Sequence, residues 1–264
     1  MTTIWSILLA ILIFGCIIAI HEFGHFIAAK QNGIQVNEFA IGMGPKIFCF
    51  QKGETLYSLR LFPIGGFCSM EGEDAESKNA RAFDQKPVWR RMIVVLAGAF
   101  MNLVLGFVLL IATTCSDPYL ISNTIHGFHE QATSNTCGLQ AGDTIVSLNG
   151  SHIFTITDLQ YKLSNESGEP FTVVVERDGK KVKLQDVTFR DQENNDWLDF
   201  SLEPQQKTVF HVLSYAAKDT VATGKLIWMS LTELVTGKYG IQDLSGPVGT
   251  VEVISNAATA GTTA

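Results

Sequence analysis

Two histidines four positions apart enclose a glutamate in the segment His21-Glu22-Phe23-Gly24-His25. On an α-helix, positions i and i+4 share a face, so both imidazoles can reach one cation. Neutral imidazole is a common ligand of Zn²⁺, and a carboxylate beside the metal can take a proton from a water molecule that the metal activates. The spacing therefore predicts a zinc site with His21 and His25 as ligands and Glu22 as the catalytic base.

The motif lies at the end of a long apolar segment. Residues Ile4–Ile20 are almost wholly apolar, and the helical pattern extends to Ala29. That is about 26 residues, or roughly 39 Å of helix, which is enough to cross a bilayer. Ionisable residues in such a span are costly and are functional by default. Two alternatives stay open: the three residues only mark the interfacial end of the helix, or the segment is a cleaved signal peptide, although its start contains no basic residue.

A second apolar segment covers residues 92–114 and follows the pair Arg90-Arg91. The loop between the two segments, residues 30–91, holds nine Lys or Arg, whereas the N-terminal stub holds none. The positive-inside rule then places this loop in the cytoplasm and the N-terminus outside. The sequence predicts a multi-pass protein of the cell membrane in which the chain after residue 114 starts on the outer face.

Charge and cysteine content exclude two other classes of protein. The net charge is −7 and basic residues form no block, which argues against a nucleic-acid partner. The cysteines are odd in number, widely spaced and without a C-x-x-C pair, which argues against a disulfide framework or a cysteine-type zinc site. They are Cys16, Cys49, Cys68, Cys115 and Cys137.

Several motifs in the same order resemble the site-2 protease family of intramembrane zinc proteases, in particular its bacterial RseP-type branch. The first is the apolar helix with the two histidines. The others are Phe39–Pro45 (F-A-I-G-M-G-P), Tyr57–Phe67 (Y-S-L-R-L-F-P-I-G-G-F) and Leu244–Gly249 (L-S-G-P-V-G). The resemblance covers nearly the whole chain and implies the same ligands, His21 and His25, and the same base, Glu22.

The resemblance also implies a third zinc ligand, an aspartate in an L-D-G motif on a later membrane helix. The sequence contains no such motif. Leu198-Asp199 is followed by Phe200 in a charged stretch, and Asp243 lies in a polar turn. We expect that the sequence is truncated before this ligand. The full-length parent is then an active protease, and the chain as given is inactive or nearly so.

Residues 36–70 are predicted to form β structure rather than helix. Residues Thr55–Phe62 partly alternate and are rich in strand formers, and Lys52-Gly53 marks a turn. In the family this loop dips towards the active site, where an exposed strand edge could hold an unwound substrate by β-addition. We expect substrate contacts at Leu59, Leu61, Gly65 and Gly66. The alternative is a hairpin that only packs on the membrane face.

The second apolar segment carries Ala97–Asn102 (A-G-A-F-M-N), where the family more often has A-G-P-x-x-N. Small residues let helices approach closely, and a lone asparagine in lipid usually finds a polar partner. We expect Asn102 to line the active-site cavity and to contact substrate. A hydrogen bond between helices with only a packing role is an equally good interpretation.

Residues 115–204 have the length of one small domain. Gly138–Gly150 (G-L-Q-A-G-D-T-I-V-S-L-N-G) resembles a segment of PDZ domains, with a strand at Thr144–Leu148 and a tight turn at Asn149-Gly150. Such a domain either binds peptide ends by strand addition or acts as a passive size filter. Beyond it, residues 207–236 read as an amphipathic helix on or near the membrane surface.

The expected fold class is an α+β membrane protein. It has transmembrane helices at residues 1–30 and 92–114, a cytoplasmic-side loop with membrane-associated β hairpins at 31–91, an extracytoplasmic PDZ-like domain at 115–204, and an amphipathic helix with the approach to a next span at 205–264. The expected function is zinc-dependent cleavage of transmembrane segments. Expected partners are the lipid bilayer and a substrate such as a pre-cleaved anti-sigma factor or a signal-peptide remnant. The alternative function is a non-catalytic membrane adaptor that binds peptides through the PDZ-like domain.

Overall fold

A computed structural model describes residues 2–130, 132–165, 170–189, 198–237, 249 and 253. Asp243 and the Leu244–Gly249 motif, apart from Gly249, lie outside the described residues, as does the expected approach to a next span. The chain divides near Gly106 into two compact units. Each unit is described by itself below.

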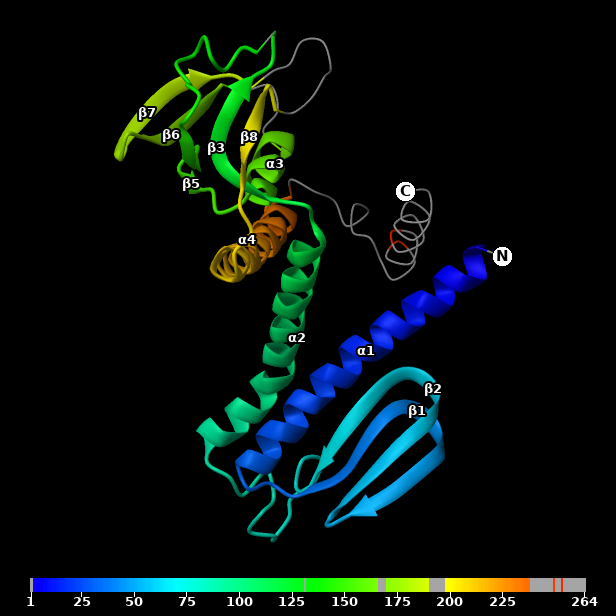
Figure 1. The fold of residues 1–264 in the computed structure, drawn as a ribbon. Helices are drawn as coiled ribbons and strands as arrows, with labels where there is room; N and C mark the ends of the chain where they lie inside the picture. Colours follow the sequence, from blue (N-terminus) through cyan, green and yellow to red (C-terminus); the bar gives the residue numbers. More distant parts are fainter. Residues whose placement is uncertain are drawn as a thin grey trace. The chain divides into compact units, whose positions relative to one another are not determined.

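Two long helices dominate the first unit (Figure 1). Helix α1 covers Thr2–Gln31 and helix α2 covers Val88–Ser116. Both are long and apolar enough to cross a membrane, over Trp5–Gln31 and Val88–Ser116, and most of their large apolar side chains are exposed. The two predicted apolar helices are therefore present. Helix α2 begins four residues earlier than predicted, since the pair Arg90-Arg91 continues the helix after Pro87 instead of preceding it.

The β structure expected over residues 36–70 consists of two long antiparallel strands, β1 (Val36–Lys52) and β2 (Thr55–Met70). Both strands bend back, as Figure 1 shows, so the first half of β1 pairs on both sides. Ala40 faces Ser58 on one side and Phe67 on the other, and Ile41 likewise faces Leu59 and Gly66. The last part of β2 is therefore an outer strand that pairs with β1 on one side only.

Residues 71–87 connect β2 to α2. They contain turns and bends only, but hydrogen bonds tie them to the rest of the unit. Gln35 donates its main-chain N–H to Arg81 and accepts from Glu71 N–H, while the Arg81 guanidinium pairs with both oxygens of Glu54. Lys30 at the end of α1 also contacts Glu54, at 2.6 Å. These contacts attach the loop to the hairpin and to α1.

The second unit is built on an antiparallel sheet in the order β7-β6-β4-β3-β8, with β5 paired to β4. The strands are β3 (Leu120–Phe128), β4 (Thr144–Leu148), β5 (Ser151–His152), β6 (Phe171–Arg177), β7 (Lys180–Val187) and β8 (Phe200–Gln205). Helix α3 (Ile156–Asn165) packs its apolar face into the same core, where Leu159, Leu163 and Val173 are buried. The strand predicted at Thr144–Leu148 is confirmed.

Helix α4 covers Val209–Val235 and begins at Thr208, whose hydroxyl accepts the His211 N–H. The helix predicted over residues 207–236 is therefore present. One side of α4 makes polar contacts with the α3 region: the Asp219 carboxylate accepts from the hydroxyls of Thr155 and Thr157, at 2.9 and 3.2 Å. Another side exposes a line of apolar residues that includes Phe210, Leu213, Val221, Trp228, Leu231 and Val235.

Candidate metal centre

The two imidazoles of the motif lie on one face of α1. The His21 and His25 rings are 4.8 Å apart between centroids and meet edge to face, with an interplanar angle of 79°. Four residues along an α-helix advance about 6 Å and slightly more than one turn, which gives this spacing. The interpretation of the motif as a pair of neighbouring imidazoles is therefore correct in the fold.

Helix α2 approaches α1 closely at the level of the histidines because small residues face one another. A β-carbon at Gly24 of α1 would overlap the main-chain carbonyl of Ala97 on α2. Such close packing is the usual role of small residues between membrane helices. It brings Val94, Gly98 and Asn102, spaced four residues apart on α2, to the two imidazoles.

The His25 ring is fixed by the main chain of α2. His25 Nδ1 lies 2.7 Å from the carbonyl oxygen of Val94. A carbonyl can only accept, so Nδ1 carries the proton and the Nε2 of the neutral ring keeps its lone pair. This is the arrangement in which metal-binding histidines are usually held, with one nitrogen donating to an oxygen and the other on the metal.

Both Nε2 atoms lie around one point next to Gly98. A β-carbon placed on Gly98 would be 2.5 Å from His25 Nε2 and 2.6 Å from His21 Nε2. Zinc–nitrogen distances are near 2.0–2.1 Å, so one ion close to this point is within reach of both nitrogens after small side-chain movements. The residues present therefore fit two ligands of a zinc ion, and the missing side chain of Gly98 leaves the space.

Glu22 lies on the neighbouring face of α1, beside the outer strand of β2. A β-carbon at Gly66 would be 3.4 Å from Glu22 Cγ and 3.9 Å from Ile18. Closer to the start of α1, Gly15 lies against the main-chain carbonyl of Pro63 in the same way. The segment Pro63–Gly66 thus lies along α1 and ends next to the carboxylate of the motif.

Residues 9–264 match peptidase family M50. A Clostridium acetobutylicum protein named, provisionally, as a zinc metalloprotease is 36% identical over 97% of this chain and 76% of its own length. The regulator of sigma-W protease RasP of Bacillus subtilis is 28% identical over 97% of this chain and 81% of its own length.

The chain belongs to peptidase family M50. This is the site-2 protease family that the motifs resemble, so the M50 chain is a metalloendopeptidase of the site-2 protease type and Zn²⁺ is its expected cofactor. Its two apolar helices agree with a membrane protein.

No third ligand joins the two histidines within the part of the M50 chain that the structure describes, since it holds no group of three His, Cys, Asp or Glu able to bind one metal. Asp199 is buried in the second unit, where its carboxylate accepts from the N–H groups of Thr133 and Ser134 and from the Ser134 hydroxyl. It therefore has a structural role. Burial, with a further contribution from the charge of Glu22, raises the pKa of the Cys68 thiol to about 12.

The substrate-contact residues predicted on β2 differ in where they lie. Gly66 is next to Glu22, and Gly65 precedes it in the outer strand with a φ of 90°, against the side chain of Met43. Leu59, by contrast, lies in a strand that pairs on both sides, with Ile41 and Phe48. Leu61 is in the same half of β2 and is about half exposed. Only the two glycines lie in the outer strand near the motif.

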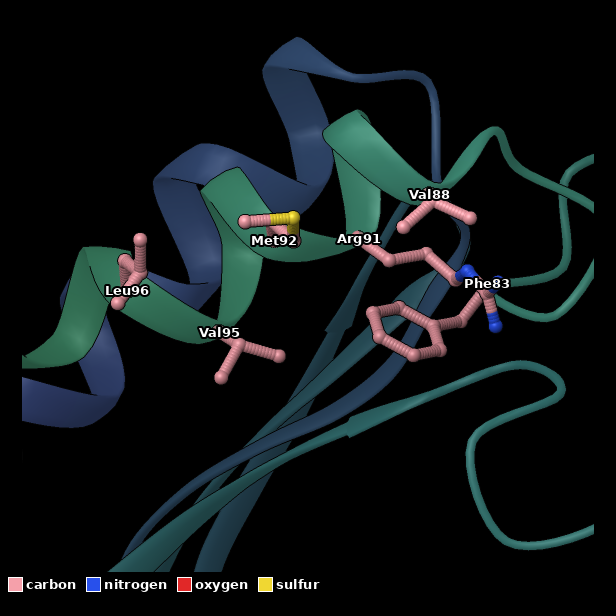
Figure 2. A pocket seen from close by; sticks show the side chains of 6 residues that line it. All are labelled: Phe83, Val88, Arg91, Met92, Val95 and Leu96. Carbon is pink, nitrogen blue, oxygen red and sulfur yellow. The ribbon is translucent and has the colours of Figure 1, made fainter.

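An apolar hollow of about 340 Å³ on the flank of α2 contains none of the predicted site residues (Figure 2). Figure 2 shows the Arg91 side chain reaching towards Phe83. Its lining residues are Phe83, Val88, Arg91, Met92, Val95 and Leu96. The candidate metal centre is instead the point between α1 and α2 beside Gly98.

The sequence analysis did not identify two features of this candidate site. One is the Val94 carbonyl, which contacts His25, and the other is the space that Gly98 leaves beside the two imidazoles. Gly98 was noted only as a small residue for helix packing. The four-residue spacing of positions 94, 98 and 102 places them on one face of α2, and this signal could have pointed to Gly98. A main-chain carbonyl carries no sequence signature, so the role of Val94 needed the fold.

Proposed function

We propose that this M50 chain carries the catalytic centre of an intramembrane endopeptidase that cuts transmembrane segments of other membrane proteins. The observation that carries the proposal is that the Nε2 atoms of His21 and His25 converge beside Gly98. Glu22 lies between these two histidines in α1, which is long enough to cross a membrane. Two imidazoles and a carboxylate within a membrane-spanning helix are costly in lipid, and such residues usually have a function.

His21 and His25 hold zinc in this proposal, and Glu22 is the general base. Zinc, when bound, acts as a Lewis acid that polarises the scissile carbonyl and makes a water molecule acidic. Glu22 accepts the proton of that water and passes it to the leaving amine. The Val94 carbonyl orients His25, and the tight contact at Gly24 keeps α2 at the distance that the orientation needs.

The outer strand of β2 is proposed to hold the substrate. A transmembrane substrate must lose its helical hydrogen bonds before a peptide bond can be attacked, and a free strand edge offers replacements. The segment Pro63–Gly66 is suited to this role, because it lies along α1 and ends at Gly66, which pairs on one side only, with Ile41, and lies next to Glu22. We place the main contacts at Gly65 and Gly66, and we assign Leu59 and Leu61 a smaller role.

The second unit is proposed to be a PDZ-like domain on the outer face of the membrane. The turn at Gly142-Asp143, the β4 strand and the turn at Asn149-Gly150, both residues of which have positive φ, support the likeness. Hydrophobic C-terminal peptides titrated onto residues 115–204 test peptide binding. Saturable binding supports recognition of a substrate terminus, and its absence supports a passive size filter.

The substrate class is proposed from one relative. RasP of Bacillus subtilis is named regulator of sigma-W protease. On the strength of that name we propose a membrane-bound anti-sigma factor, already trimmed by another protease, as the substrate. A signal-peptide remnant is the second candidate. With nine basic residues in the loop 30–91, we further propose that this loop faces the cytoplasm and that the N-terminus lies outside.

Zinc analysis and a cleavage assay test the proposal together. The purified chain should bind zinc, and His21→Ala and His25→Ala should each abolish binding, whereas Glu22→Gln should retain it. With two protein ligands in the described part, we expect weak zinc binding and little cleavage of a model transmembrane substrate by the chain as given. Zinc binding that survives both histidine substitutions would refute the proposed centre.

A non-catalytic adaptor is the competing function, since it would also use the second unit to bind peptides. The two functions differ in Glu22, which an adaptor does not need. Cleavage that Glu22→Gln removes while peptide binding persists rules out the adaptor. If Glu22→Gln changes neither cleavage nor peptide binding, the adaptor is favoured.

A further inference from the structure

Asn102 contacts His21 through its side-chain amide. Asn102 Nδ2 lies 3.2 Å from His21 Nδ1, and within the described residues the buried Asn102 Oδ1 has no hydrogen-bond partner. The oxygen and nitrogen ends of an amide have nearly the same shape, so a rotation of 180° exchanges them without moving the rest of the side chain. The chemistry of the neighbouring ring decides between the two orientations.

The orientation of the amide determines which nitrogen of His21 is free. If the amide N–H donates to Nδ1, then Nδ1 is the lone-pair nitrogen and the proton of the neutral ring is on Nε2. A protonated Nε2 cannot bind a metal. If the amide oxygen faces the ring, Nδ1–H donates to it and Nε2 is free, and it is Nε2 that lies beside Gly98.

The rotated amide also uses the oxygen that otherwise has no partner. Its nitrogen then takes the buried position, where a main-chain carbonyl one turn back in the helix is the usual acceptor for an asparagine side chain. In this orientation both rings are held alike. His25 donates to an oxygen at position 94 and His21 to an oxygen at position 102, with Gly98 halfway between them.

We propose that Asn102 is a positioning residue that holds His21, through its amide oxygen, in the tautomer with the proton on Nδ1. The inference deepens the proposed function and rests on it, because the tautomer matters only where Nε2 binds a metal. Asn102 touches neither the reacting bond nor the metal. Its effect passes through the imidazole of His21.

The tautomer can be measured without metal. In the zinc-free chain labelled with ¹⁵N-histidine, at a pH where the rings are neutral, nitrogen chemical shifts separate the two tautomers. The His21 signal is assigned by its loss in His21→Gln. We expect the proton of His21 on Nδ1 in the wild type and in Asn102→Asp, whose carboxylate accepts as the amide oxygen does. Asn102→Leu should give a mixture, with His25 unchanged as the internal control.

Zinc affinity provides the second measurement, by competition with a chromophoric chelator. Loss of a second partner of a metal-binding histidine typically weakens metal binding 10–100-fold. We expect such a loss in Asn102→Leu and near wild-type affinity in Asn102→Asp. If Asn102 had a mainly structural role, both substitutions would weaken zinc binding equally. The tautomer of His21 would then remain unchanged.

Two results would overturn the inference: the proton of wild-type His21 on Nε2, or equal zinc affinity in the wild type and Asn102→Leu. A different result would refute the proposed function and leave the role of Asn102 intact. If the chain binds no zinc while Asn102→Leu still alters the His21 tautomer, the role of Asn102 stands and the metal centre does not.

Discussion

Gly24 on α1 lies directly against the main-chain carbonyl of Ala97 on α2, with no room for a β-carbon between them. This contact sets the distance between the helix that carries the imidazoles and the helix that orients them. The metal centre therefore depends on a residue without a side chain.

Gly24→Ala should separate the two helices. The added methyl group meets a carbonyl that cannot move away without moving α2, and such overpacking typically costs about 1–3 kcal/mol. We expect a lower unfolding temperature in detergent and weaker zinc binding. Gly106→Ala on α2 is the matched control, because a β-carbon there meets nothing within 4 Å. Equal behaviour of the two variants would show that the contact does not set the helix spacing.

Gly98→Ala should remove zinc binding and leave the fold in place. Its methyl group would occupy the point around which the two Nε2 atoms lie, and the rings can rotate away because they are the ends of flexible side chains. The measurement is zinc per chain after gel filtration, alongside the circular dichroism spectrum. A variant that keeps a full zinc content would contradict the location of the metal.

Acidification should weaken the attachment of the loop to α1. Hydrogen bonds from Arg81 and Lys30 lower the pKa of Glu54 from 4.5 to about 2. A folded-state pKa below the unfolded value means that this cluster stabilises the fold fully above about pH 4.5, and that the contribution is lost as the pH falls towards 2.

Unfolding temperatures at pH 7, 4 and 3 check this expectation. The wild type should exceed Glu54→Gln at pH 7, and the difference should shrink as the pH falls. Glu76→Gln, at an exposed position in the loop between β2 and α2, is the control and should follow the wild type at each pH. A difference that stays constant with pH would assign the effect to something other than the ionised carboxylate.

Asp219→Ala should loosen α4 from α3. The substitution leaves the hydroxyls of Thr155 and Thr157 without their acceptor, and Thr155 is buried, so a cost of about 1–3 kcal/mol is expected. Amide hydrogen exchange should become faster in residues 209–235. Lys218→Ala, at the neighbouring exposed position, should leave exchange unchanged. Unaltered protection in Asp219→Ala would show that the other contacts of α4, such as the ion pair of Lys225 with Asp158, are sufficient to hold the helix.

Much of the fold could be predicted because the signals are local. Apolar length identifies α1 and α2, and the alternation around Thr55 together with the turn at Lys52-Gly53 identifies the hairpin. The neighbouring imidazoles of His21 and His25, the proposed ligand pair, follow from helical spacing within one segment.

The rest depends on pairings across the chain. The first half of β1 pairs on both sides because both strands bend back, and alternation cannot predict which half of a strand becomes the outer one. That is why Leu59 was expected at the edge and instead lies in a strand paired on both sides. The contact of Asn102 with His21 spans 81 positions, so the sequence left two interpretations of Asn102 equally open.

The four-residue spacing of Val94, Gly98 and Asn102 constrains how this protein can change its length. One residue inserted between positions 94 and 102 would rotate one end of this face by about 100° relative to the other and carry an oxygen away from its histidine. Insertions should therefore accumulate in the loops and in the second unit, whereas the two facing helical stretches should change only by substitution.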